Sequence, residues 1–211
     1  MAGTITKLAF QQRNRERVSV HLDGRYAFGV PAIEAAKLKR GQFLSDVDIA
    51  RLRELDARER AYERVLRLLA HRPRSKAEVR RYLERKNTPA DAISSVIERL
   101  SQDGYLDDAA FVRFWVENRE RFNPRGLWAL RQELRQKGVA EDLIEDALAD
   151  LDSEASAYRA ARHSLRKWAG LEYGDFRKAV GGYLVRRGFG YGVMKDVVEQ
   201  LWQEMGTERN S

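Results

Sequence analysis

The sequence predicts a mainly α-helical chain: three tandem three-helix repeats in an elongated array, with a small N-terminal β-hairpin element. Two observations carry this prediction. Residues 74–100 align without gaps on residues 125–151, which lie 51 positions further on, and a shift of 50 more finds a third copy. A period of about fifty residues is typical of stacked supersecondary units. The repeated positions include Val79, Leu130 and Val180, and also Leu83, Leu134 and Leu184.

The second observation is that residues 1–30 differ in pattern from the rest of the chain. Thr4 to Phe10 and Arg17 to Leu22 alternate between apolar and polar residues and are rich in β-branched side chains. Asp23-Gly24 favours a hairpin, because a type I′ turn needs positive φ at both central positions. We expect an antiparallel sheet of two or three strands, packed on a helix because so small a sheet is marginal alone.

The segment after the sheet contains two helix signals. Pro31 to Lys39 has short helical character that ends at Gly41. Ser45 is a plausible N-cap, and no Gly or Pro interrupts residues 46–72. One long helix, or two abutting helices, can therefore run to His71, before Pro73 stops it.

Each repeat is expected to contain three helices, which begin and end at corresponding positions of the repeat. Ser75 and Glu78 form a capping box at the start of the second helix of the first repeat. The second helices end at Asn87, Gly138 and Gly188, residues that tolerate the left-handed conformation of a helix C-cap. First helices are predicted at 61–70, 110–122 and 157–169, and third helices at 90–102, 140–151 and 191–204.

These boundaries divide the chain into four domains. We predict an N-terminal hairpin and helical element followed by three repeats, at residues 1–56, 57–106, 107–152 and 153–211.

Composition narrows the functional classes. The formal charge of +7 and a pI near 9.7 favour an anionic partner, although ordinary solubility explains a charge of this size too. The absence of Cys excludes disulfides and thiolate metal sites. We find no apolar signal segment and no apolar run long enough to span a membrane, so we expect a cytoplasmic protein without membrane contact.

Charge is sorted by helix. The second helices are basic and the third helices acidic, most clearly at residues 141–150, so stacked repeats should carry a basic face and an acidic face. Lys86, Lys137 and Arg187 close the second helices, where favourable interaction with the helix dipole is an equally good explanation. The candidate contact residues are Arg74, Arg80, Arg81, Lys86, Arg119, Arg125, Arg131, Arg135, Lys137, Arg186 and Arg187.

The remaining motifs favour structural roles. Asp107 and Asp108 are explained as N-cap residues rather than metal ligands. Trp128 lies one position off its apolar stripe; it can stack on a base or anchor a partner, but the edge of the core is the favoured interpretation. The three His residues are scattered, and no nucleophile–base pattern occurs, so we predict no catalytic residue, metal or cofactor.

The chain closely resembles the RecX family of bacterial recombinase regulators. The resemblance is carried by Arg74-Ser75, by Gly104–Asp108 with Phe111 and Arg119, by Pro124-Arg125-Gly126, and by Glu133-Leu134 with Lys137-Gly138. Arg187-Gly188-Phe189 stands for the family's third turn, whereas Asn87-Thr88 departs from the Lys-Gly-Phe that is usual in the first.

The resemblance implies a non-enzymatic regulator, usually an inhibitor, of the RecA recombinase. Such a protein lies in the groove of the RecA–DNA filament and modulates recombination, DNA repair and SOS co-protease activity. Family members also bind DNA by themselves, so single- and double-stranded DNA are expected partners of a monomeric chain. The alternative is a direct DNA-binding regulator, transcriptional or architectural, that uses its three-helix units on duplex DNA.

Overall fold

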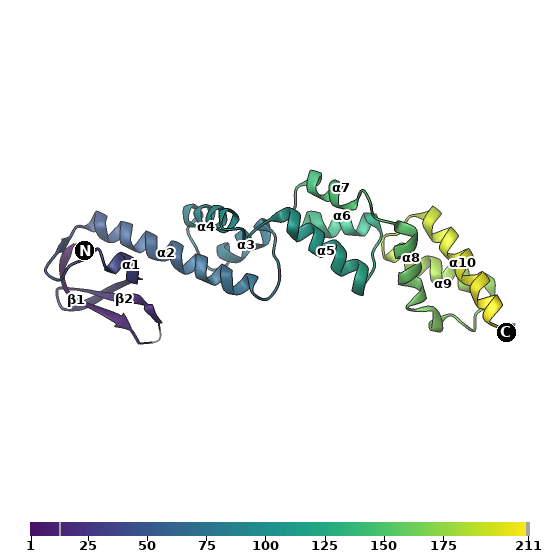
Figure 1. The fold of residues 1–211 in the computed structure, drawn as a ribbon, viewed down its shortest axis with the longest axis horizontal. Helices are drawn as coiled ribbons and strands as arrows, with labels where there is room; N and C mark the ends of the chain where they lie inside the picture. Colours follow the sequence, from purple (N-terminus) through teal and green to yellow (C-terminus); the bar gives the residue numbers. More distant parts are fainter. Residues whose placement is uncertain (13, 210–211) are drawn as a thin grey trace. The chain divides into compact units, whose positions relative to one another are not determined.

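The computed structural model describes residues 1–12 and 14–209 and confirms the predicted fold class, a mainly helical chain with a small N-terminal sheet (Figure 1). It divides into two compact units. The first contains Met1–Arg72 and Val79–Leu106, and the second contains Pro73–Glu78 and the described residues from Asp107 onward. The four-domain division stays a prediction.

The N-terminal sheet has four strands in the order β3-β2-β1-β4, all antiparallel to their neighbours. Asp23 and Gly24 have φ values of 49° and 82°, which confirms the predicted hairpin turn. The fourth strand was not predicted, because a two-residue strand shows no alternation. The strands are β1 (Gly3–Gln11), β2 (Asn14–Leu22), β3 (Arg25–Pro31) and β4 (Phe43–Leu44).

One helix, α2 (Asp46–Leu69), packs on both the sheet and the first repeat. It follows the short helix α1 (Ala32–Ala35) and begins at the capping box of Ser45 and Asp48, in which the Ser45 hydrogen bonds lower the pKa of Asp48. Its 24 residues settle the choice between one helix and two. Ile49 and Leu52 lie in the core of the sheet, whereas Ala61 and Val65 lie in the core of the first repeat.

The first repeat is completed by α3 (Lys76–Glu84) and α4 (Ala90–Gln102). Val79, Leu83 and Leu100 are fully buried against Val65 of α2. The Tyr62 hydroxyl donates a hydrogen bond of 2.6 Å to Asp103, and burial together with this bond raises the pKa of Tyr62 to about 12.

The second unit contains two further hydrophobic cores. Leu130 and Ile144 are central in one, and Phe176 and Leu184 in the other. The predicted first helix of the third repeat ends early, because the Ser164 amide bonds to the Ala161 carbonyl at 2.9 Å and tightens the chain into a short 3-10 helix. The helices are α5 (Asp108–Phe122), α6 (Leu127–Gln136), α7 (Glu141–Leu148), α8 (Ser153–Arg162), α9 (Tyr173–Arg186) and α10 (Tyr191–Arg209).

All three second helices end in the same left-handed turn, as predicted. The φ values of Asn87, Gly138 and Gly188 are 54°, 73° and 84°. In each case the amide of the next residue donates to the carbonyl four residues before the turn, at 3.1 to 3.2 Å. This is the hydrogen bond of a Schellman motif, and Asn87 makes it without a glycine.

Candidate functional site

The candidate cations differ in whether the chain itself supplies a partner for them. Arg80, Lys86 and Arg186 are exposed, and within the described chain their side chains make no hydrogen bond or ion pair. Arg81 is exposed too, but it does not belong to this unpaired group. Long basic side chains without carboxylate partners are available to an anionic partner.

Two candidate arginines of α6 are held by the neighbouring helix α7. Arg131 donates to both carboxylate oxygens of Glu145, at 2.7 and 2.8 Å, and Arg135 donates to Glu141 in the same bidentate way. These hydrogen bonds lower the pKa of Glu145 and of Glu141 and raise the pKa of each arginine. The expectation of separate basic and acidic faces is therefore wrong for this repeat.

A third group of charges surrounds Glu133 of α6. Its Oε2 accepts hydrogen bonds from Nε1 of Trp115 at 2.9 Å and from Nε of Arg119 at 2.7 Å. Nε of Arg125 lies 3.8 Å from the other carboxylate oxygen. All these side chains are at least partly buried, so the hydrogen-bonded Arg119 stabilises the repeat from within, whereas Nε of Arg125 makes no hydrogen bond within the described residues.

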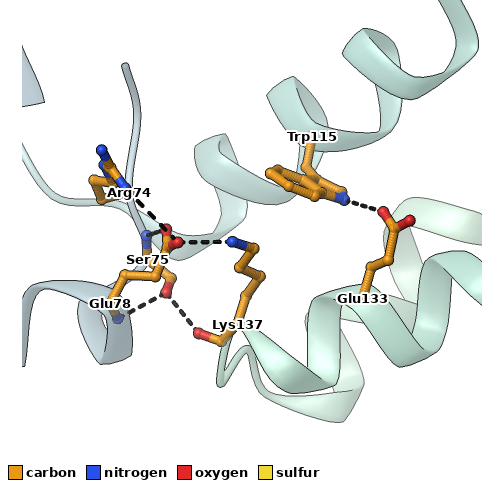
Figure 2. Close-up of polar contacts among 6 residues, drawn as sticks. All are labelled: Arg74, Ser75, Glu78, Trp115, Glu133 and Lys137. Carbon is orange, nitrogen blue, oxygen red and sulfur yellow. Dashed lines mark hydrogen bonds and ion pairs between the residues drawn. The ribbon is translucent and has the colours of Figure 1, made fainter. Parts of the chain in front are cut away.

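Lys137 joins the end of α6 to the segment that precedes and opens α3 (Figure 2). The Ser75 hydroxyl donates to the Lys137 carbonyl at 2.6 Å, and the Lys137 ammonium lies 2.8 Å from Glu78. Glu78 also completes the predicted capping box with Ser75 and lies 4.0 Å from Arg74. The ammonium lies 4.8 Å from the centre of the Trp115 ring, a cation–π contact. We call these contacts the first joint.

A second joint repeats this arrangement between the start of α6 and the end of α9. The Gly126 amide donates to the Arg187 carbonyl at 3.0 Å, and the Arg187 guanidinium donates to the Asn123 side chain and lies over the Tyr183 ring. A Cβ on Gly126 would lie 2.1 Å from the Gly188 carbonyl oxygen. Gly126 corresponds to Ser75, and Arg187 to Lys137, so each joint connects the start of one second helix to the end of the next.

Comparisons with known proteins agree with this repeat structure. The family model described as the N-terminal domain of regulatory protein RecX matches residues 3–45. The models for the first and second three-helix domains of RecX match residues 61–100 and 107–148. The chain belongs to the RecX family.

RecX relatives and structures match over most of the chain. Regulatory protein RecX of Bacillus subtilis is 34% identical over 205 residues, which cover 95% of this chain and 78% of the relative. That of Bacillus velezensis is 32% identical, with 97% and 80% covered. A crystal structure of regulatory protein RecX superposes with a TM-score of 0.73 at 26% identity, covering 93% of this chain and 99% of that one. The RecX crystal structure from Lactobacillus salivarius, at 20% identity, shares the fold, with a TM-score of 0.61 over 69% of this chain and 97% of that one.

The residues that carry the RecX resemblance are largely joint residues. These contacts join the start of one second helix to the end of the next, and they give Lys137 and Arg187 a structural role. The repeat alignment marks both kinds of position, the start of each second helix and the cap at its end. It does not show that the start in one repeat contacts the cap in the next, which is why these contacts were missed.

Asp107 caps its own helix, as predicted, whereas Asp108 caps a different helix. Asp107 accepts from the amides of Ala109 and Ala110, at 2.8 and 3.2 Å. Asp108 accepts from the Lys76 amide at 2.8 Å, so it caps α3, a distant helix, rather than its own. No group of three or more potential metal ligands occurs among the residues that the structure describes.

Trp128 corrects a prediction about the core. Its side chain is 67% exposed, so its placement at the edge of the core is wrong. It lies beside Leu127 and Phe189 in the lining of an open groove of about 690 Å³ between α6 and the α9–α10 turn.

Over the described part of the chain, no helix combines the length and apolar character that crossing a bilayer requires.

Proposed function

We propose that this RecX family member regulates the RecA recombinase as an inhibitor, by binding in the groove of the RecA–DNA filament. The observation that carries the proposal is the match of nearly the whole chain to proteins named Regulatory protein RecX. Regulation of this kind modulates recombination, DNA repair and SOS co-protease activity. The chain acts as a monomer in the cytoplasm, without catalysis, cofactor or metal.

The contacts of this proposal centre on the unpaired cations, two in the first compact unit and one in the second. Arg80, Lys86 and Arg186 face solvent without a carboxylate partner in the described chain, so binding costs them no internal ion pair. Arg131 and Arg135, in contrast, must first give up their bidentate bonds to α7. Arg74, Arg119, Lys137 and Arg187 contribute indirectly, through the contacts that hold their helices in place.

The test is ATP hydrolysis by RecA on single-stranded DNA, with the protein added after filaments have formed and DNA in excess. We expect inhibition well below one molecule per RecA protomer. Arg80→Glu with Lys86→Glu should weaken inhibition, while Lys39→Glu with Arg40→Glu, an equal charge change at exposed residues, should not. Equal inhibition by both variants would remove Arg80 and Lys86 from the surface, and no inhibition by the unaltered protein would refute the proposal.

A second candidate function is direct regulation through DNA. The unpaired cations on three-helix units favour it, since such units can place a helix in the major groove. A sequence-reading protein prefers particular duplex sites and loses affinity steeply with salt. Tight, site-selective binding to duplex DNA, together with no effect on RecA, would favour this function.

A further inference from the structure

Three arginines on α2 line a pocket at the turn between α3 and α4. One of them, Arg53, also donates a hydrogen bond of 3.5 Å to the Ala27 carbonyl and lies over the Phe28 ring. Arg53, Arg60 and Arg64 are spaced by seven and four residues, so they share one face of the helix. Together with Lys86 they line a pocket of about 220 Å³, closed on its other side by the left-handed turn at Asn87. Both walls belong to the first compact unit.

The carboxylates of this part of α2 already have cations. Asp56, the acidic residue in the pocket lining, is buried and bonded to Arg17 of β2 and, at 3.0 Å, to Nε of Arg60. The remaining acidic residues of this stretch pair elsewhere: Glu54 with Arg58, Glu59 with Arg99, and Glu63 with Arg67. No described carboxylate is paired with Arg64 or Lys86. The pocket is therefore left with a surplus of positive charge.

The ion pairs of Asp56 also orient the pocket. Arg17 fixes Asp56, and Asp56 holds Arg60 through Nε, which leaves the terminal nitrogens of Arg60 for another partner. A guanidinium fixed in this way loses less conformational freedom when it binds, and its planar fork matches a phosphate group.

We propose that this pocket binds the phosphate backbone of a nucleic acid, without regard to base sequence. From Arg53 to Arg64 the helix rises about 16 Å, at roughly 1.5 Å per residue. A B-form strand carries about five phosphates over that length, at roughly 3.4 Å per phosphate. The inference deepens the proposed function, on which it rests for its nucleic-acid partner, and it adds a second contact surface on α2.

The lining favours a nucleic acid over an acidic protein. Its apolar members are Ala57 and Pro89, and it contains no aromatic side chain on which a base could stack. Protein interfaces depend on large anchors such as Trp, Tyr and Leu in desolvated pockets. Phosphate contacts need only cations, and they carry no sequence information.

The experiment measures fluorescence anisotropy of labelled DNA with the full chain and no recombinase, at several salt concentrations. Arg53→Ala with Arg64→Ala is compared with the matched control Lys39→Ala with Arg40→Ala, which removes the same charge from exposed residues of the same unit. Two unrelated sequences are used, each single- and double-stranded, and poly-glutamate serves as a second titrant.

We expect the pocket variant to bind every DNA roughly tenfold more weakly, and its slope of log affinity against log salt to fall by about 2 on duplex, because each phosphate contact contributes about 0.9. The control should match the unaltered protein, and circular dichroism should be the same for all. Equal affinity and slope in variant and control would overturn the proposal. So would a loss confined to one sequence, or equally tight, pocket-dependent binding of poly-glutamate. A chain that binds DNA through this pocket but leaves RecA unaffected would retain this inference and refute the proposed function.

Discussion

The second helices of the first two repeats, α3 and α6, occupy corresponding positions in the sequence, but their corresponding arginines differ in whether a carboxylate binds them. Arg80 of α3 corresponds to Arg131 of α6, 51 positions later. Arg131 is bound by Glu145, whereas the position that corresponds to Glu145 in the first repeat is Ser94. Arg80 is therefore exposed and unpaired within the described residues.

This difference shows that a basic helix in a repeat is not by itself a binding surface. Both helices bury the same apolar positions and end in the same left-handed turn. What separates Arg80 from Arg131 is the residue that the third helix places opposite, a serine in one repeat and a glutamate in the other. The availability of Arg80 is thus decided by one residue of the neighbouring helix and not by the repeat pattern.

The largest expected difference between the two helices lies at the residues just before them, Ser75 and Gly126, where the space available for a side chain differs. Gly126→Ser would give α6 the residue that α3 has at Ser75, but its Cβ would meet the backbone of Gly188 at 2.1 Å. Because backbone atoms cannot rotate away, we expect a loss of stability of about 3 kcal/mol or more. Urea denaturation checks this.

Ser75→Gly is the reciprocal control. It removes the hydroxyl that bonds to the Lys137 carbonyl and should cost about 1 kcal/mol. Equal losses of stability in the two variants would contradict the conclusion that the backbone is packed more closely at Gly126 than at Ser75.

The paired cations of α6 can be converted into unpaired ones. Glu141→Gln with Glu145→Gln should release Arg131 and Arg135 and strengthen DNA binding severalfold, at a steeper salt dependence. Asp142→Asn with Asp146→Asn, on the same helix, changes the net charge equally and leaves both bidentate pairs in place. An identical gain from both variants would show that net charge alone governs binding.

The smallest expected effect is a dependence of the free energy of unfolding on pH, caused by the ion pair of Arg131 and Glu145. The hydrogen bonds from Arg131 lower the pKa of Glu145 below its ordinary value of 4.5. Its contribution to stability is therefore fully present above that value and is lost as the pH falls through the lowered pKa of the folded state.

The measurement compares urea midpoints of Glu145→Gln and the unaltered protein. We expect a small gap at about pH 7 that shrinks as the pH falls below the ordinary value of 4.5 and the carboxylate becomes protonated in the folded state as well. A gap that stays constant across this range would show that the ionisation of Glu145 makes no contribution to stability.

Local signals predicted the features that depend on a few adjacent residues. The turn at Asp23-Gly24, the capping box at Ser75 and the three left-handed caps each follow from backbone requirements that only certain residues satisfy. The fold class followed from the fifty-residue period, since apolar positions at helical spacing repeat whichever way the helices pack.

The partners of the charged residues could not be predicted in this way. Asp108 caps α3 from 32 positions away, and Ser75 and Lys137 are 62 apart. Which cations meet a carboxylate depends on how neighbouring helices are rotated and spaced, and no local pattern encodes that. The exposure of Trp128 was missed for the same reason, and the basic face of α2 was missed because the turn opposite it belongs to a distant part of the sequence.

The continuity of α2 sets a rule for the length of the chain. The helix carries Leu52 in the core of the sheet and Ala61 in the core of the first repeat, with no break between them. One inserted residue would rotate everything after it by about 100°, so one of the two cores would lose its contacts. An insertion of seven residues, close to two full turns, would restore the direction of both faces. Natural variation in length should therefore spare the stretch from Leu52 to Ala61 and accumulate in the loops on either side of the helix.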